Sequence, residues 1–221
     1  MMVAQLLVKD LRVTRKFILL GLAFVGFFCF ALGAFEGLPL AVPAAILGHF
    51  LTVTASKMDE RNNNGMLLAS LPVRRRDLVT AKYMSLLLFT GLAFLLTLGW
   101  RLVGGAVLAA DELPSFQAGA TLIALLALAV FYAVYFPLYF QFGPRAAHVL
   151  DIIVMFTLAA GGLAAMRAME WFGSSGAVEK FRSWWNSAGD GSLALWCAVL
   201  IVGLLTASWL VSVLLYERRD L

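Results

Sequence analysis

The chain has 221 residues, of which 62% are hydrophobic and 14% are charged. Soluble globular domains are about half apolar and a quarter charged, so this composition indicates an integral membrane protein. About six apolar segments of roughly 20 residues would occupy most of the length, which excludes a separate soluble catalytic domain. Basic residues beside these segments account for the net charge of +4, so orientation in the bilayer explains it better than nucleic-acid binding.

Residues 1–16 precede the first long apolar run and combine leucines with charged residues. The leucines can share one helical face, while Lys9, Arg12 and Lys16 lie largely on another. This pattern is typical of an amphipathic helix that lies in the inner membrane interface. No small-residue cleavage site follows the first apolar run, so we do not expect a cleaved signal peptide.

Six apolar runs predict membrane spans, because each is long enough to cross the hydrocarbon core as a helix. The first two spans are residues 17–35 and 38–56, which fall within residues 17–56. The third and fourth are residues 84–100 and 118–140, which fall within residues 84–140. The fifth and sixth are residues 149–166 and 193–216. Asp151, Gly161 and Gly162 interrupt the fifth. Between the spans lie residues 57–83, 141–148 and 167–192, and residues 217–221 form a tail. The expected fold is therefore all-α, a polytopic bundle of about six transmembrane helices.

Basic residues lie mainly on one side of this predicted bundle. With both termini in the cytosol, thirteen of the 17 Lys and Arg residues face the cytosol. These are Lys9, Arg12, Arg15, Lys16, Lys57, Arg61, Arg74, Arg75, Arg76, Lys82, Arg145, Arg218 and Arg219. Arg167, Lys180 and Arg182 lie outside, and Arg101 lies within or near a span. Because cytosolic loops are enriched in Lys and Arg, residues 57–83 are expected to be cytosolic.

Residues 167–192 contain an aromatic cluster in a segment that is too short and too polar to span the membrane. Its members are Trp171, Phe172, Phe181, Trp184 and Trp185. Aromatic residues of this kind lie at the level of the lipid headgroups, so we predict a surface-lying or shallowly re-entrant segment on the outer side.

The most polar stretch is MDERNNNGMLLASLPVRRRDLVTAKY, residues 58–83. NNNG is a turn or helix-stop signal, MLLASL is a short apolar patch, and Pro72 closes that patch before a second, basic element. An apolar patch exposed to the cytosol needs a partner to cover it. Three interpretations are open: a solvated loop, a site for anionic lipid, or a docking site for another protein. The lipid site would use Arg74, Arg75, Arg76 and Lys82.

This stretch resembles the signature of permease subunits of type-2 ATP-binding-cassette (ABC) exporters, in the subgroup that includes bacterial peptide and antibiotic exporters. The shared features are an acidic residue, an Asn-bearing turn, a Leu-rich stretch, a Ser-Leu-Pro-Val core, a basic turn and a Lys-Tyr pair. Here these are Glu60, Asn62 to Asn64, Leu67 and Leu68, Ser70 to Val73, Arg74 to Arg76, and Lys82 with Tyr83. The segments LLVKDL, before the first span, and FPLYFQFG, at the end of the fourth, are similar to the family too.

The resemblance implies that the insert contains a coupling helix, which seats in a groove on a separate cytosolic ABC ATPase subunit. The residues expected to carry this contact are Glu60, Asn62, Met66, Leu67, Leu68, Leu71, Pro72, Arg74, Arg75, Arg76 and Lys82. The sequence contains no G-x-x-x-x-G-K-[ST] phosphate loop, so ATP and Mg²⁺ are expected on the partner and no cofactor on this chain. A second permease copy or a homologous permease, in a bacterial cytoplasmic (inner) membrane, would complete the transporter.

Two ionisable residues lie within or near predicted spans. His49 is in the middle of the second span, about 16 Å along a helix from Leu38. Such residues are functional candidates by default, but a neutral histidine that hydrogen-bonds to another helix is the alternative. Arg101 lies near the outer end of the third span, where it would either reach the headgroups or act at the outer exit of a pathway.

Tyr132, Tyr135 and Tyr139 recur at helical spacing on the fourth span, around Pro137. Their rings and hydroxyls would line a route for an amphipathic substrate or serve ordinary helix packing. Asp151 is either a first-turn acid favoured by the helix dipole or a second coupling contact. No cluster has metal-ligand spacing and no nucleophile has an evident base, so we expect neither a metal site nor an enzyme.

The predicted function is a permease that moves an amphipathic or hydrophobic substrate, such as a peptide, a drug or a lipid-like molecule, by alternating access. The alternative is a membrane-integral accessory or lipid-binding structural protein without transport activity. An ion-driven transporter is a third class, but it usually needs intramembrane carboxylates, and only Asp151 lies within a candidate span.

The charge asymmetry generates a topological prediction. Single cysteines placed at Asn63 and Ser175, in a background that lacks Cys29 and Cys197, should react with an impermeant maleimide from opposite sides of sealed vesicles. Labelling of both positions from the same side would contradict the six-span arrangement.

Overall fold

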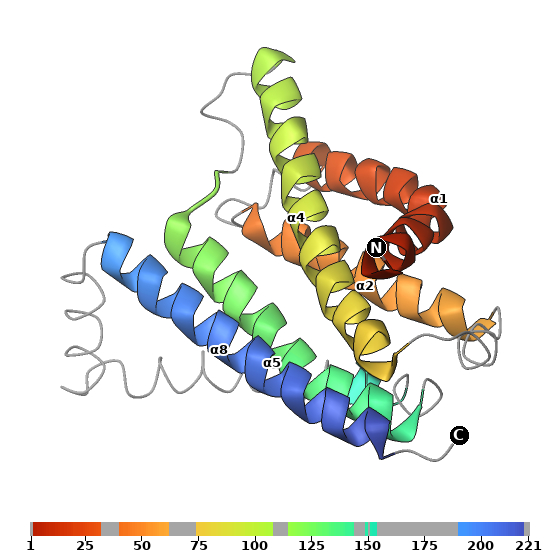
Figure 1. Ribbon diagram of the computed structural model, residues 1–221. Helices are drawn as coiled ribbons and strands as arrows, with labels where there is room; N and C mark the ends of the chain where they lie inside the picture. Colours follow the sequence, from red (N-terminus) through yellow and green to blue (C-terminus); the bar gives the residue numbers. More distant parts are fainter. Residues whose placement is uncertain are drawn as a thin grey trace.

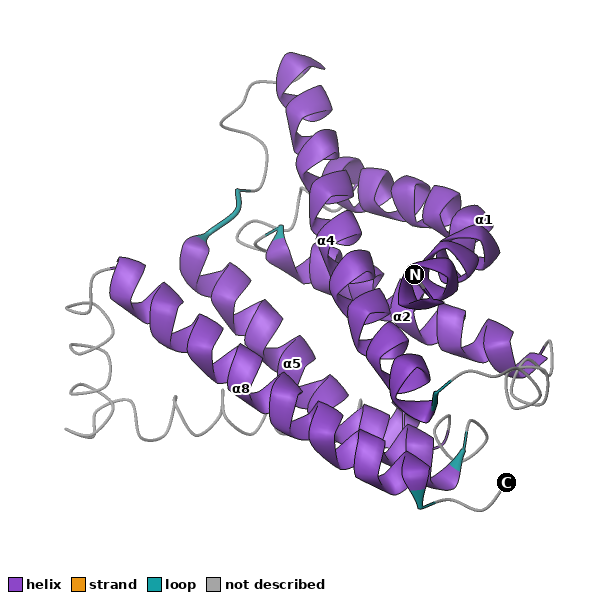
Figure 2. Cartoon of the chain, viewed as in Figure 1, coloured by secondary structure: helices purple, strands orange, loops and turns teal. Residues whose placement is uncertain are grey.

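The computed structural model describes residues 2–31, 40–61, 74–107, 115–143, 149, 151–153 and 190–218. Its long helices are α1 (Met2–Ala31), α2 (Ala41–Arg61), α4 (Arg75–Val107), α5 (Ala118–Phe142) and α8 (Asp190–Glu217) (Figure 1). The part of the chain that the structure describes contains no strand (Figure 2). The expected all-α membrane helix bundle is confirmed.

Three of the described helices are long and apolar enough to cross a membrane, judged by length and composition. They are Arg75–Ala106, Ala118–Phe142 and Ala194–Glu217. Helices α1 and α2 cover most of the first two predicted spans. Of the fifth predicted span, only residues 149 and 151–153 are described. The count of six spans therefore stays a prediction, as do the aromatic outer segment and the loop at residues 144–148, which lie outside the described residues.

Helix α1 runs without interruption through residue 16, where we expected an interfacial helix to end and a span to begin. The α1 ribbon bends instead of breaking (Figure 1). The Thr14 hydroxyl donates to the Asp10 carbonyl at 2.7 Å and also lies 3.4 Å from the Leu11 carbonyl oxygen. Such bonds from a threonine to its own helix are a recognised cause of bending.

The polar insert is likewise partly helical. Residues 57–61 are the last residues of α2, and α4 begins at Arg75 and continues past Arg101 to Val107. The basic C-terminal end of the insert and the third predicted span are therefore parts of one continuous helix, α4. Residues 62–73, between α2 and α4, lie outside the described residues.

Helices α2, α5 and α8 run in one direction, and α4 runs against them (Figure 1). The start of α4 therefore lies at the same end of the bundle as the last turn of α8. At the other end, the Leu40 amide donates to the Ser115 carbonyl at 3.3 Å, which joins the starts of α2 and α5. Helix α5 ends at Phe142 and is capped by Gly143, whose φ of 83° favours glycine and whose amide donates to the Tyr139 carbonyl.

Two hydrophobic cores lie on different sides of α4. One, against α5 and α8, comprises Val79, Tyr83, Leu86, Phe131, Tyr132, Tyr135, Phe136, Phe140 and Val213. The other, against α1 and α2, comprises Val25, Leu40, Leu47, Leu51, Ala55, Phe89 and Ala93. Helix α4 therefore packs against both halves of the bundle.

Buried hydroxyls of α2 and α4 bond to their own helices. Thr52 donates to the Gly48 carbonyl at 2.8 Å, Ser56 to the Thr52 carbonyl at 3.1 Å, and Thr97 to the Ala93 carbonyl at 2.8 Å. These polar groups therefore need no water inside the bundle.

Helix α1 packs closely against Trp100 of α4 at Gly26. The Trp100 indole Nε1 donates to the Leu22 carbonyl at 2.7 Å. A Cβ added at Gly26 would lie 2.7 Å from Cζ2 of Trp100, so only glycine leaves room for this ring.

Gly26→Ala should therefore destabilise the protein by about 1 to 3 kcal/mol, because the indole must move and its hydrogen bond is lost. Gly99→Ala is the matched control, since a Cβ there has no neighbour within 4 Å. The control should be neutral or slightly stabilising, because alanine favours helix more than glycine. Thermal unfolding in detergent measures both, and equal stability of the two variants would contradict the packing described.

Candidate functional site

The first turn of α4 is attached to the last turn of α8. Arg75 donates through Nη1 to the Tyr216 carbonyl at 2.9 Å and to the Glu217 carbonyl at 3.1 Å. Its guanidinium lies 5.8 Å from the centre of the Tyr216 ring. Arg76 Nε lies 2.8 Å from Glu217 Oε1. The last carbonyls of a helix have no partner within it and attract cations, so Arg75 acts as a cap for α8.

Two turns later, α4 is attached to α1 through a buried carboxylate. Asp10 is 3% exposed. Ser85 donates to its Oδ2 at 2.8 Å, and Lys82 Nζ lies 3.5 Å from the same oxygen. Lys9 Nζ lies 3.1 Å from Oδ1. A buried carboxylate requires such partners, because an unpaired charge inside a bundle is very costly.

The residue next to Lys82 contacts the opposite half of the bundle. The Tyr83 hydroxyl lies 2.6 Å from Ser208 Oγ and 2.9 Å from Ser212 Oγ, both on α8. Ser208 also bonds to the Ala133 carbonyl of α5 at 2.9 Å. The adjacent Lys82 and Tyr83 thus attach α4 to α1 on one side and to α8 and α5 on the other.

These contacts account for three residues of the predicted coupling set. Arg75, Arg76 and Lys82 all have partners within the chain, whereas Arg74 is exposed immediately before α4. Glu60 lies in the last turn of α2. The other members lie outside the described residues, namely Asn62, Met66, Leu67, Leu68, Leu71 and Pro72. The coupling role of the set stays a prediction.

A second polar cluster lies between α2 and α5. His49 Nδ1 lies 3.1 Å from the Tyr132 hydroxyl, so His49 does hydrogen-bond to another helix. His49 Nε2 lies 3.6 Å from Oδ1 of Asp151, which is 8% exposed. That Asp151 oxygen is buried without a hydrogen-bond partner. Neither interpretation offered for Asp151, a first-turn acid or a coupling contact, anticipated its position beside His49.

An apolar groove of about 290 Å³ opens beside this cluster. Its described lining consists of Val42, Ala45, Ile46, His49, Ala124, Ala127, Leu128 and Phe131. The small alanines of α2 and α5 leave this space, and the Phe131 ring packs edge-on against His49 at 4.8 Å between ring centres. Among the described residues, His49 is the only ionisable member of the lining.

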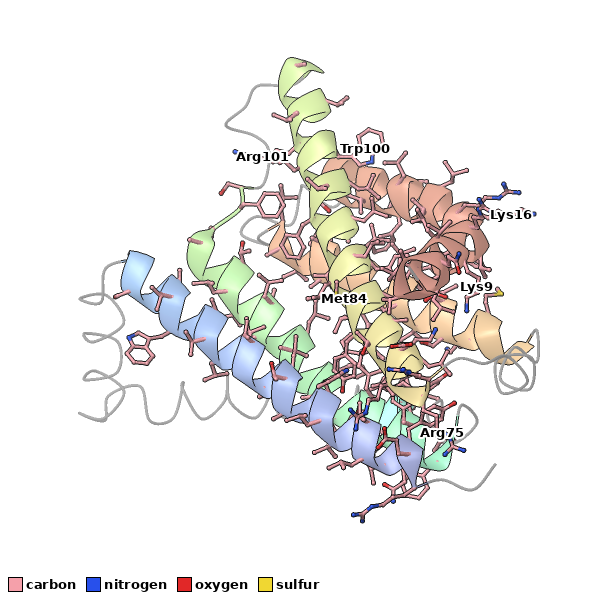
Figure 3. The ribbon with its side chains drawn as sticks, viewed as in Figure 1. Lys9, Lys16, Arg75, Met84, Trp100 and Arg101 are labelled. Atoms are coloured by element: carbon pink, nitrogen blue, oxygen red, sulfur yellow. The ribbon has the colours of Figure 1, made fainter. Side chains whose placement is uncertain are left out.

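The other residues predicted to line a substrate pathway, namely the tyrosines of α5 and Arg101, do not line this groove. Tyr135 is buried and stacks on Phe131, with ring centres 5.6 Å apart, and Tyr139 stacks on Tyr135 at 6.0 Å. Tyr132 and Tyr135 thus lie within the helix packing of this chain. Arg101 projects from the opposite side of α4 to Trp100 (Figure 3). Whether these residues line a pathway stays a prediction.

Sequence reasoning missed Asp10, Ser208 and Ser212. Asp10 was not singled out in the amphipathic pattern of residues 1–16, although its spacing to Thr14 and Gly21 places it on the buried face of α1. Ser208 and Ser212 are one helical turn apart, which is the only sequence signal that they share a face. Within the described part of the chain, no group of three His, Cys, Asp or Glu side chains is placed to hold a metal ion.

Comparison with known proteins identifies the family of the chain. A family model described as ABC-2 family transporter protein matches residues 5–217, which is nearly the whole chain. No curated protein and no solved structure matches the chain. The match extends from the basic first half of α1 to the last residue of α8, and it therefore includes every contact of α4 described above. The chain belongs to the ABC-2 family of transporter proteins and is the membrane-embedded permease part of an ABC transporter.

Proposed function

We propose that this permease exports an amphipathic or hydrophobic substrate by alternating access, driven by a separate ATPase that binds ATP and Mg²⁺. In this proposal the insert, residues 57–83, contains the coupling helix, whose apolar patch seats on the ATPase at the cytosolic face. A second permease copy or a homologous permease completes the translocation path. The permease supplies the shape and the apolar surface of the path, and the ATPase supplies the energy.

The observation that carries the proposal is the set of contacts at the start of α4. This helix follows directly after the predicted coupling helix, and its first turns contact α8 through Arg75 and Tyr83 and α1 through Lys82. A displacement of residues 62–73 would therefore move α4 together with helices from both halves of the bundle. Rigid-body movement of packed helices is a common route between two conformations.

The surface of the bundle supports a partner in the membrane and an apolar substrate. Large apolar side chains of α8 and α5 are strongly exposed, with Leu195 at 63%, Trp196 at 68%, Val202 at 64% and Ile123 at 60%. Lipid and a second permease are the two surroundings that would cover such a surface in a membrane. An apolar substrate would suit the same kind of surface.

The coupling helix is tested by replacing Leu67 and Leu68 with Asp. Unpaired charges in the predicted contact should cost several kcal/mol, so the ATPase should no longer co-purify, while membrane insertion should survive. The matched control places two Asp residues at Asn63 and Asn64, in the same insert but outside the apolar patch and outside the set of residues expected to carry the contact. A fully coupled complex of the Leu67→Asp, Leu68→Asp variant would contradict docking through this patch.

The proposed transfer of movement from α4 to α8 through Arg75 generates a second prediction. Gly191 lies in the first turn of α8 with open space around it, so Gly191→Cys should fit there. In a background without Cys29 and Cys197, its maleimide labelling should change between nucleotide-free and ATP-bound complexes. Arg75→Gln should retain the ATPase but reduce this change several-fold, because the cap on α8 is lost.

Arg218→Gln is the matched control, since Arg218 is exposed directly after α8 and is not among the residues expected to contact the ATPase. It should respond to ATP as the parent does. An unchanged response of Arg75→Gln would show that α8 does not follow α4 through this contact, and a parent without any response would contradict the proposed movement itself.

A further inference from the structure

One buried carboxylate, Asp151, lacks the partners that such a group needs among the described residues. It is 8% exposed, and its Oδ1 has no hydrogen-bond partner within the described part of the chain. That oxygen lies 3.6 Å from Nε2 of His49, an imidazole that is positive only when it is protonated. An ionised group with so little compensation inside a membrane protein is costly, and such groups usually serve a function.

Asp10, the other buried carboxylate of the described residues, has a different environment. Ser85 donates to it at 2.8 Å, and Lys9 and Lys82 lie 3.1 and 3.5 Å from its oxygens. The bundle thus provides a hydroxyl and two ammonium groups for Asp10, but only an imidazole beside Asp151. A cation from outside the chain would supply what Asp151 lacks.

Asp151 lies deep in the bundle, although the fifth predicted span begins at residue 149. Its neighbour His49 lies near the middle of α2, and Tyr132 lies near the middle of α5. The Tyr132 hydroxyl lies 3.1 Å from Nδ1 of His49 and 3.3 Å from the His49 carbonyl oxygen, so the imidazole is held with Nε2 towards Asp151. Opposite charges attract more strongly at such a depth than in water.

The apolar groove of about 290 Å³ between α2 and α5 opens at the same imidazole. Val42, Ile46 and Leu128 line it together with His49. Phe131 adds an aromatic ring, and aromatic rings attract organic cations. An apolar groove that adjoins a poorly paired carboxylate suits a molecule with an apolar tail and a positive head.

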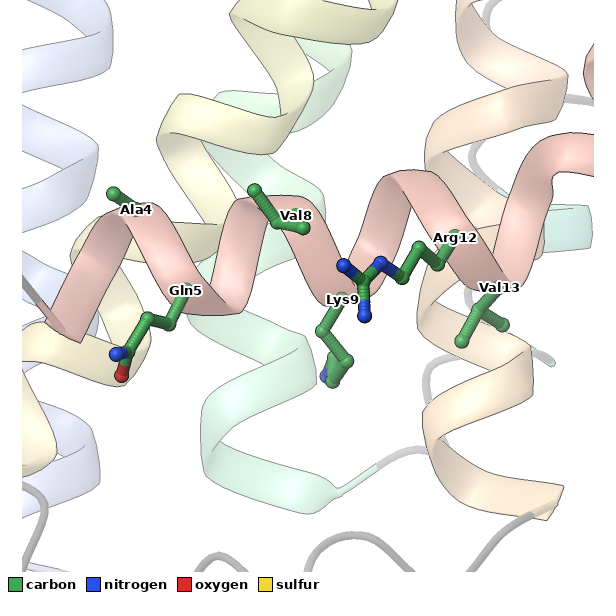
Figure 4. A pocket seen from close by; sticks show the side chains of 6 residues that line it. All are labelled: Ala4, Gln5, Val8, Lys9, Arg12 and Val13. Carbon is green, nitrogen blue, oxygen red and sulfur yellow. The ribbon is translucent and has the colours of Figure 1, made fainter.

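A groove along the first half of α1 has the opposite character (Figure 4). Its described lining contains Lys9 and Arg12 and no acidic residue. Asp10, which contacts Lys9, already has Ser85 and Lys82 as further partners. A cationic ligand is therefore expected between α2 and α5 and not on α1, where it would meet like charges.

We propose that the cluster between α2 and α5 binds an amphipathic substrate whose head is an organic ammonium ion. The Asp151 carboxylate pairs with the ammonium group, His49 lies where head and tail meet, and the tail contacts Leu128 and Phe131 in the groove. This inference rests on the proposed export function, and it narrows the amphipathic or hydrophobic substrate of that function to one that carries a positive charge.

The experiment measures the binding of 4-phenylbutylammonium to the whole chain in phosphatidylcholine nanodiscs at pH 7, by ligand-observed NMR. 4-Phenylbutanol has the same tail without the charge, and empty nanodiscs correct both signals for partition into lipid. The ammonium ion should bind roughly ten-fold more tightly than the alcohol, as expected for a charge-assisted hydrogen bond.

Three variants separate the head from the tail. Asp151→Asn keeps the size of the side chain and should weaken binding of the ammonium ion roughly ten-fold, with the alcohol unaffected. Ala124→Leu fills the groove and should weaken both ligands. Asp77→Asn is the matched control, because Asp77 is an acid in the first turn of α4 and does not line the groove, and it should bind both ligands as the parent does.

Thermal unfolding without ligand checks the state of Asp151 itself. Asp151→Asn should be at least as stable as the parent, because it removes a poorly paired buried charge. A clearly less stable Asp151→Asn variant would show that a proton on His49 already balances the carboxylate, and it would overturn the proposal. Equal binding of the ammonium ion and the alcohol, or an equal loss in Asp77→Asn and Asp151→Asn, would overturn it as well.

The result is separate from the test of export, because binding is measured without the ATPase. Transport of 4-phenylbutylammonium is then followed in proteoliposomes that contain the permease, the ATPase and ATP. Binding that depends on Asp151 without ATP-driven transport would contradict the export function and support the site. Transport that Asp151→Asn leaves unchanged would support export and contradict the site.

Discussion

The arrangement of the bundle depends on a buried carboxylate that must be neutralised. Asp10 is 3% exposed, between helices of a membrane protein, where an unpaired charge would cost several kcal/mol. The observed placement of α1 on α4 brings both Ser85 and Lys82 within reach of Asp10. The carboxylate therefore fixes the register between the two helices, which apolar packing alone would specify less strictly, because apolar contacts have little directionality.

The neighbouring tyrosine extends this constraint to the rest of the molecule. Because Lys82 and Tyr83 are adjacent on α4, they point to different sides of the helix, and the tyrosine hydroxyl reaches Ser208 and Ser212 of α8. With Arg75 on the last carbonyls of α8, the first turns of α4 hold both halves of the bundle. In an ABC-2 permease, these contacts of α4 therefore follow, along the chain, directly after the segment proposed to contact the ATPase.

The sequence predicted what depends on composition and local pattern. The all-α membrane fold followed from apolar runs of span length, and the Lys-Tyr pair was recognised by resemblance. Contacts between distant segments were not predictable: Ser85 and Asp10 are 75 positions apart, and a lone acid among cations looks like a surface charge. The expected boundaries at residue 16 and before span three fell within α1 and α4, because polar and apolar stretches can belong to one continuous helix. His49 was recognised as a candidate, but Asp151 as its neighbour was not.

The central claim is that the Asp10 and Lys82 charges stabilise the bundle as a pair. A double-mutant cycle of Asp10→Asn and Lys82→Met, read as the free energy of unfolding in SDS titrations, measures this most directly. Each single variant should lose stability because it leaves a buried charge with fewer partners, and the double variant should lose clearly less than the sum, with a coupling energy above about 1 kcal/mol. Additive losses, within about 0.5 kcal/mol, would show that the two residues act independently and would contradict the account.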